Sequence, residues 1–112
     1  MKKDKVYLTH IVDAISDIEK FMNGVSKEQF FENREKQYAV LRALEIIGEA
    51  TKNLSAELKT ENSDADWKHI AGMRDKLIHA YFGVNLPLVW ETVKKDLPQL
   101  KKQAQKLLTS SE

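Results

Sequence analysis

Residues 35–54, EKQYAVLRALEIIGEATKNL, decide the fold. The side chains of one stripe return every three or four positions, at Tyr38, Leu41, Leu44, Ile47, Thr51 and Leu54, and Val40, Ala43 and Ala50 widen it. This spacing is typical of an α-helix with one buried face. The stretch therefore predicts the longest helix of the chain, with Tyr38 among its core residues.

The sequence before this stretch predicts two more helices. Residues 7–22 carry apolar side chains at the same spacing, and Asn23-Gly24 is a typical helix end. Residues 26–29, SKEQ, then have the form of a capping box, which predicts a short helix through Phe31. The chain is expected to turn back at this point.

The sequence after it predicts a polar loop over 60–65 and two further helical regions. One runs from Trp67 to Phe82 and stops at Gly83. The other starts after Asn85 with a proline in its first turn, restarts at Asp96-Leu97-Pro98 and then carries Leu100, Ala104, Leu107 and Leu108 inward. No alternating strand pattern occurs. We therefore expect an all-α, up-and-down bundle of about five helices, forming a single domain over residues 1–112.

Composition excludes several classes of function. The chain has 18 Lys+Arg against 17 Asp+Glu and no Cys, which rules out both a broad cationic surface and a thiolate zinc site. No phosphate loop, paired-His zinc motif or nucleophile elbow is present, so we expect no metal and no cofactor. No apolar run approaches the roughly 18 residues of a membrane span, and we expect a soluble cytoplasmic protein that does not contact a membrane.

Residues 73–82, MRDKLIHAYF, carry the candidate chemistry. On a continuous helix Arg74 and Tyr81 would lie about 20° apart, and Asp75 and His79 would form an i,i+4 pair that orients the imidazole. A guanidinium binds phosphate through two hydrogen bonds, and an imidazole can move the proton of a ribose 2′-hydroxyl. The segment therefore points to phosphodiester cleavage without a metal.

A structural reading of the same residues stays open. Arg74 can pair with a glutamate of a neighbouring helix, His79 can be a hydrogen-bonded core histidine, and Tyr81 and Phe82 can be packing residues. On a helix Arg74 and His79 would be about 140° apart, so that they flank a face instead of sharing it. Two copies of the helix meeting across a twofold axis would complete the site, which favours a homodimer.

Several strings occur in a recognisable order along nearly the whole chain. They are RALEIIGEA at 42–50, Trp67, GMRDKLIHAYFGV at 72–84, Val89-Trp90 and Asp96-Leu97-Pro98. The chain resembles the HepT-like branch of the HEPN superfamily in these strings. Arg74 and His79 match the ends of that family's Arg-x4-His motif, and Tyr81 completes its Arg-x4-His-x-Tyr extension.

The resemblance implies a HEPN-like homodimer, alone or within a larger hetero-oligomer, that acts as a metal-independent endoribonuclease on an RNA substrate. It also implies the toxin of a type VII-like toxin–antitoxin pair, neutralised when an MntA-like nucleotidyltransferase antitoxin transfers AMP to Tyr81. By the family pattern Arg74 holds the scissile phosphate, His79 is general base or acid, and Asp75 supports them. Ala80 departs from the pattern, because relatives often carry an acidic residue there.

Two other functions remain open at this stage. The chain can be a noncatalytic helical binding subunit of a nucleotidyltransferase complex, or a purely structural helical dimer that leaves the charges of the motif unexplained. RNA cleavage would distinguish the endoribonuclease from both of these alternatives. On the long helix, Glu49 and Arg42 can each face the motif helix, or form ordinary salt bridges.

Overall fold

The computed structural model describes residues 2–79 and 83–110, and of Lys2, Arg74, Ile78 and His79 it describes the backbone alone. The elements are α1 (Lys2–Met22), α2 (Lys27–Glu32), α3 (Arg34–Lys52), α4 (Ala56–Glu61), α5 (Trp67–Ala71), α6 (Met73–Leu77), β1 (Ile78–His79), β2 (Gly83–Val84), α7 (Leu86–Glu91), the π-helical turn η1 (Thr92–Asp96) and α8 (Leu97–Ser110). Apart from two short strands, every element described is helical. The predicted all-α class is confirmed.

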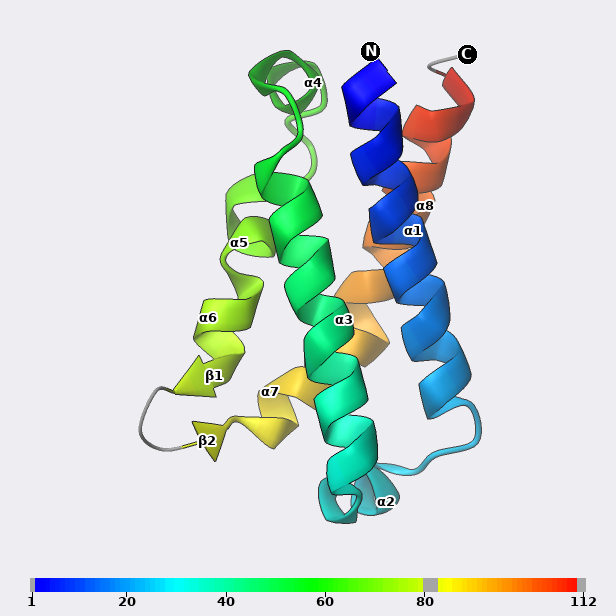
Figure 1. Ribbon diagram of the computed structural model, residues 1–112, viewed down its shortest axis with the longest axis vertical. Coiled ribbons are helices and arrows are strands. Elements are labelled where there is room, and N and C mark those ends of the chain that lie inside the picture. Colours follow the sequence, from blue (N-terminus) through cyan, green and yellow to red (C-terminus); the bar gives the residue numbers. More distant parts are fainter. Residues whose placement is uncertain (1, 80–82, 111–112) are drawn as a thin grey trace.

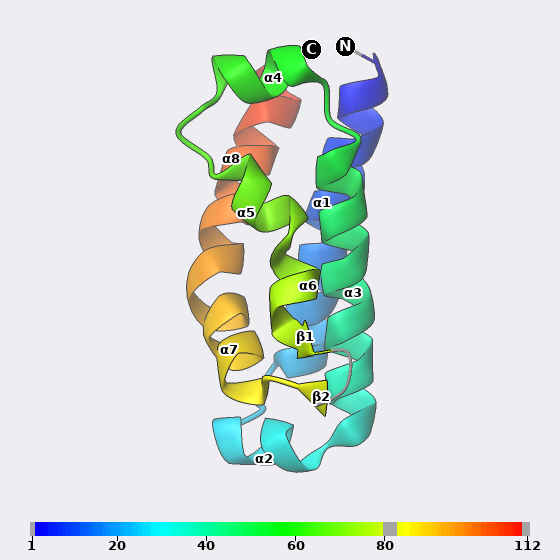
Figure 2. The same ribbon diagram turned by 90° about the vertical axis from the view of Figure 1, so that its left-hand side faces the viewer.

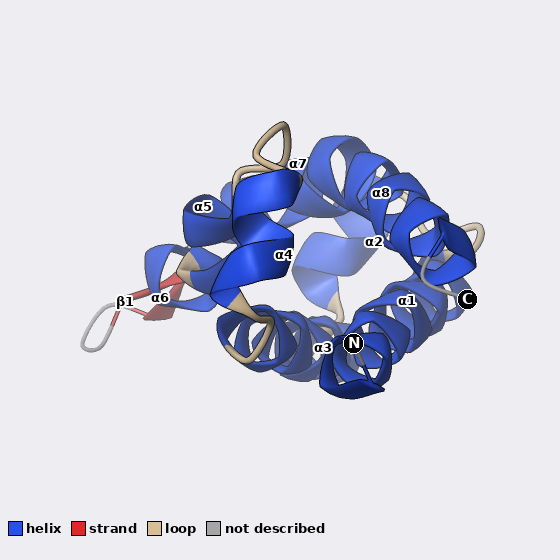
Figure 3. Ribbon diagram, turned by 90° about the horizontal axis from the view of Figure 1, so that it is seen from above, coloured by secondary structure: helices blue, strands red, loops and turns tan. Residues whose placement is uncertain are grey.

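The long helices form a bundle that the short elements close. Helices α1 and α3 run side by side in opposite directions, and α8 lies on α1 (Figure 1). Helices α5 and α6 lie along α3, away from α1 (Figures 1 and 2). Viewed from above, α4 covers the end of the bundle where both termini lie (Figure 3).

The core consists of the stripes that the sequence predicts. Its side chains include Leu8, Ile11, Ile15 and Ile18 from α1, Leu44 and Ile47 from α3, and Leu97, Leu100 and Ala104 from α8. Burying each large aliphatic side chain contributes about 1.5–3 kcal/mol. The prediction for Tyr38 is wrong, since its side chain is 61% exposed. At 100° per residue Tyr38 lies between Glu45 and Glu49 around α3, on the face turned away from the core.

Helix α4 lies partly in the predicted loop, and that part of the prediction is wrong. Ser55 caps α4 by accepting a hydrogen bond from the backbone N–H of Leu58. Asp4 of α1 accepts hydrogen bonds from the backbone N–H and the hydroxyl of Ser55, both at 2.7 Å. None of the residues of α4 is buried, so the helix leaves no apolar stripe in the sequence.

The predicted helix over 67–82 is wrong at Ile78–His79, and residues 80–82 lie outside the described residues. A turn at Gly72 separates α5 from α6, and after α6 the chain enters the antiparallel pair β1–β2. The carbonyl of Leu77 accepts a hydrogen bond from the N–H of Asn85 at 2.9 Å, which ties the end of α6 to the start of α7. Gly83 lies in β2 and does not terminate a helix. In the described part of the chain, no helix is long and apolar enough to cross a membrane.

Candidate active site

Helix α5 is held against α3 by a cap, a buried ring and a glycine. The carboxylate of Asp66 accepts from the backbone N–H of His69 at 3.0 Å, and buried Trp67 donates to the Asn62 carbonyl at 3.0 Å. A Cβ at Gly48 of α3 would lie 3.2 Å from the carbonyl oxygen of Ala71. Glycine at this position therefore allows the close approach of the two helices.

Helix α6 presents the first two motif residues. Met73 and Leu77 are buried, 3% and 1% exposed, and they anchor α6 in the core. Arg74 and Asp75 follow Met73 in the first turn, and the Asp75 side chain is exposed. The short helix thus takes its position from two apolar side chains four residues apart.

His79 belongs to a different element. It lies in β1, where its partner across the strand pair is Gly83 of β2. Gly83 has a φ of +83°, a left-handed conformation that costs an L-residue about 1–2 kcal/mol. Tyr81 and Ala80 lie outside the described residues.

These positions correct the geometry expected from the sequence. Asp75 and His79 are not an i,i+4 pair of one helix, because α6 ends at Leu77. The expected alignment of Arg74 with Tyr81 assumed the same continuous helix, and Tyr81 lies outside the described residues. Arg74 and Asp75 lie on α6, which packs along α3, and His79 lies on the next element, β1 (Figures 1 and 2).

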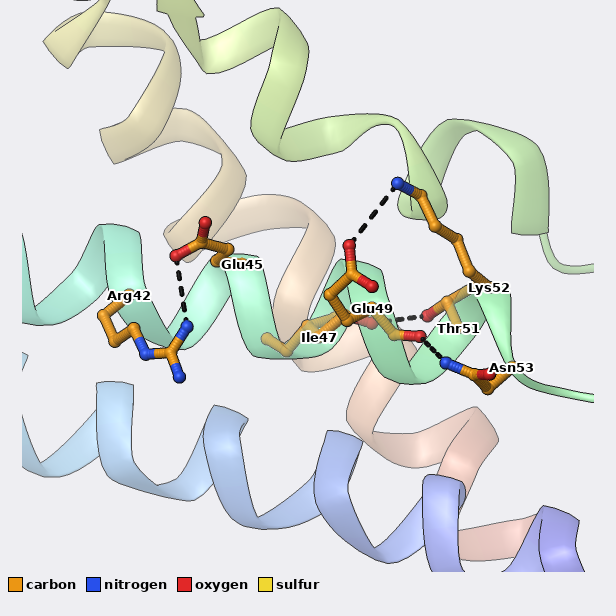
Figure 4. Close-up of polar contacts among 7 residues, drawn as sticks. All are labelled: Arg42, Glu45, Ile47, Glu49, Thr51, Lys52 and Asn53. Carbon is orange, nitrogen blue, oxygen red and sulfur yellow. Dashed lines mark hydrogen bonds and ion pairs between the residues drawn. The ribbon is translucent and has the colours of Figure 1, made fainter.

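A cavity of about 220 Å³ lies between α3 and this segment. Its lining residues are Glu45, Gly48, Glu49, Lys52, Ala71 and Asp75. Of the two α3 residues expected to face the motif, Glu49 shares this cavity with Asp75, whereas Arg42 pairs with Glu45 at 3.2 Å (Figure 4). Glu49 also pairs with Lys52 at 3.5 Å.

The cavity has a negative lining, since three carboxylates face one ammonium group. Its ion pairs are largely exposed, and such pairs contribute about 0–1 kcal/mol each to stability. Glu45 and Lys52 also line this cavity, and the sequence analysis did not predict them as site residues. The signal was available, because Glu45, Glu49 and Lys52 follow the i, i+4, i+7 spacing of one helix face, opposite the buried stripe.

Two other polar residues lie near the motif. The ammonium nitrogen of Lys76 is 3.2 Å from Nδ1 of His69, a contact that joins α6 to α5 across Gly72. The third histidine, His10, is exposed on α1. Among the residues that the structure describes, no group of three or more acidic, His or Cys side chains could hold a metal ion.

Comparison with known proteins decides the family. The family HepT-like, described as "Ribonuclease HepT-like", matches residues 11–107, which include both α6 and β1. This chain belongs to the HepT-like family.

HepT-like relatives of nearly the same length support the match. A protein of Thermococcus cleftensis named "Probable ribonuclease HepT" is 47% identical over 106 residues, 95% of this chain and 96% of that protein. A protein of Caldanaerobacter subterraneus subsp. tengcongensis named "Putative RNase" is 46% identical over 108 residues, 96% of each chain. No solved structure matches this HepT-like chain significantly.

Proposed function

We propose that this HepT-like chain is a ribonuclease that cuts RNA internally without a metal, through Arg74 and His79. The observation that carries the proposal is the family match over residues 11–107, which spans an Arg-x4-His spacing set on α6 and β1. The names of the relatives, which describe ribonucleases, support RNA as the substrate.

The chemistry is a transesterification within the RNA strand. The imidazole of His79 takes the proton of the 2′-hydroxyl, and the oxygen attacks the adjacent phosphorus, so that the O2′–P bond forms and the P–O5′ bond breaks. Arg74 binds the non-bridging oxygens and stabilises their charge as it increases. A second acid protonates the leaving 5′-oxygen. The products are a 2′,3′-cyclic phosphate and a 5′-hydroxyl end.

Two copies of the chain provide that second acid. A general base and a general acid must act on opposite sides of the phosphorus. Each chain contributes one imidazole to this site, that of His79. In a twofold homodimer of HEPN-like domains, each spanning residues 1–112, the second His79 protonates the leaving group. Asp75 supports the pair as the neighbouring carboxylate on α6.

The proposed biological role is that of a toxin in a type VII-like toxin–antitoxin pair. A nucleotidyltransferase antitoxin transfers AMP from ATP to the Tyr81 hydroxyl and releases pyrophosphate. The added phosphate carries negative charge into a site that must bind another phosphate. Modification of Tyr81 therefore prevents RNA binding while leaving the fold intact.

The decisive experiment incubates purified protein with total cellular RNA in EDTA and maps the cleavage ends. We expect cleavage to fall at least about 100-fold in both Arg74→Ala and His79→Ala. His10→Ala is the matched control, because it removes an exposed imidazole on α1 and leaves cleavage unchanged. Circular dichroism confirms that each variant is folded.

Three outcomes would contradict parts of the proposal. Equal cleavage by wild type and His79→Ala would reject the site. No cleavage by wild type, with intact mass showing Tyr81 unmodified, would instead favour a noncatalytic binding subunit of a nucleotidyltransferase complex. Sedimentation that finds only monomer at micromolar concentration would reject the two-copy arrangement.

A further inference from the structure

Tyr38 is exposed where a tyrosine would ordinarily be buried. Among the described residues only Tyr38 and Val6 are large apolar side chains with high exposure, 61% and 52%. Tyr38 lies in the first half of α3, and its ring covers none of the core. An exposed aromatic ring of this kind can bind a flat partner on its face.

Arg34 holds the Tyr38 ring in place from one turn earlier in α3. Its Nη2 donates a hydrogen bond to the Tyr38 hydroxyl at 2.8 Å, and its guanidinium carbon lies 5.6 Å from the ring centroid. The hydrogen bond to Tyr38 raises the pKa of Arg34. Within the described part of the chain Arg34 forms no ion pair, so its charge is not neutralised by a carboxylate.

Arg42 extends this arrangement by one more turn. Arg34, Tyr38 and Arg42 are spaced i, i+4, i+8, which places them along one face of α3 over about 12 Å. The Arg42 side chain is 70% exposed, and its pair with Glu45 is of the weak exposed kind (Figure 4). A phosphate can therefore displace Glu45. We call Arg34, Tyr38 and Arg42 the α3 strip.

The exposed face of α3 divides by charge. The first half carries the two arginines of the α3 strip and one exposed carboxylate, Glu35, whereas in the second half Glu45 and Glu49 line the cavity with Asp75 and one ammonium group, Lys52. Figures 1 and 2 both place β1 and β2 level with the first half of α3. The half level with β1 is thus the less negative of the two, which favours it for binding a polyanion.

We propose that the α3 strip binds single-stranded RNA next to the cleavage site, with a base stacked on Tyr38 and phosphates contacting Arg34 and Arg42. Every base offers a face for stacking, and a guanidinium binds a phosphate through two hydrogen bonds. An aromatic ring between two arginines matches the alternation of bases and phosphates along a strand. This inference rests on the proposed ribonuclease function and assigns it a substrate-binding surface.

The test measures binding of a fluorescent 2′-O-methyl oligouridine, which cannot undergo 2′-hydroxyl attack. We expect Tyr38→Ala to raise Kd about 5- to 100-fold, whereas Tyr38→Phe keeps the ring and stays within about 2-fold of wild type. Arg34→Gln and Arg42→Gln each lower the slope of log K against log salt by about 0.7. Lys102→Gln on α8 removes one exposed charge and Val6→Ala one exposed apolar side chain, and both leave Kd unchanged.

Binding and cleavage then separate the two proposals. If cleavage depends on His79 but Tyr38→Ala binds RNA as tightly as wild type, the proposed ribonuclease function stands and the proposed role of the α3 strip is rejected. Binding that depends on Tyr38 without any cleavage of RNA would uphold the strip and reject the enzyme. If Tyr38→Ala converts a dimer to a monomer in sedimentation, the α3 strip is a contact between copies and the proposal is overturned.

Discussion

Helix α3 and the segment 67–84 carry apolar residues at the same spacing, yet they fold differently. Helix α3 is continuous from Arg34 to Lys52, with Asn33 as its cap. The segment 67–84 divides into two helices of 5 residues each and a strand pair. Periodicity alone therefore predicts which residues are buried, but it does not predict that a helix continues.

The two regions differ in how stable their helices are without contacts to the rest of the protein. Helices shorter than about 12 residues are marginal in isolation, because nucleation is costly. Helices α5 and α6 are ordered by contacts with α3, by the Asp66 cap and by the hydrogen bond from Asn85 to Leu77. The region that carries the proposed chemistry thus depends on α3, which carries none of the motif.

The largest expected effect comes from removing one buried leucine in each region. Leu77→Ala in α6 and Leu44→Ala in α3 each lower the free energy of unfolding by about 2–5 kcal/mol, because both side chains are fully buried, 1% and 0% exposed. Urea titration measures the loss. Where both variants are folded, RNA cleavage falls only in Leu77→Ala, since α6 holds Arg74.

Val6→Ala serves as the exposed control for this pair and changes stability by less than about 0.5 kcal/mol. A loss as small as this for Leu77→Ala would mean that α6 is not docked on the core. Equal loss of cleavage in the two leucine variants would remove the functional distinction between the regions.

A smaller effect is expected at two glycines with positive φ. Gly83 and Gly24 have φ of +83° and +72°, and a Cβ would meet no atom within 4 Å at either position. Alanine at each therefore costs about 1–2 kcal/mol through backbone strain alone. Thermal unfolding should show matched losses, while cleavage decreases only in Gly83→Ala, next to His79. Undiminished cleavage in Gly83→Ala would show that the strand pair does not position the imidazole.

The smallest effect is expected at two helix caps. The side chains of Asn33 and Asp66 each accept a backbone N–H at 3.0 Å, from Lys36 and His69. Asn33→Ala and Asp66→Ala each cost about 1 kcal/mol. Chemical denaturation measures both losses. Cleavage at saturating RNA should change only for Asp66→Ala, because α5 supports α6, whereas Asn33 precedes Arg34 of the α3 strip and affects RNA binding. A larger loss of cleavage in Asn33→Ala than in Asp66→Ala contradicts this order.

Much of the fold could be predicted from the sequence, because each long helix buries a stripe that it carries in full. The stripes of α1, α3 and α8 were found in this way. The motif residues Arg74, Asp75, His79 and Tyr81 were selected by the density of polar groups in 73–82 and by the resemblance to the family. The prediction failed at Ile78–His79 and at Gly83, since the apolar pattern that continues through Ile78 suits a helix or a strand pair. It also failed at Tyr38, because the step of three from Tyr38 to Leu41 keeps the apolar spacing although it starts on the exposed face of the helix.

The sequence by itself determined the all-α class and the core stripes, because both depend on the local spacing of residue types, and its strings at 42–50 and 72–84 carried the resemblance to the family. The tertiary structure alone decided that α6 ends at Leu77, that Glu49 shares a cavity with Asp75, and that Arg34 and Tyr38 form an exposed pair. The physical reason is that these features depend on contacts between elements. The hydrogen bond from Asn85 to the Leu77 carbonyl forms only once the helices have packed. The same holds for the close approach of Ala71 to Gly48.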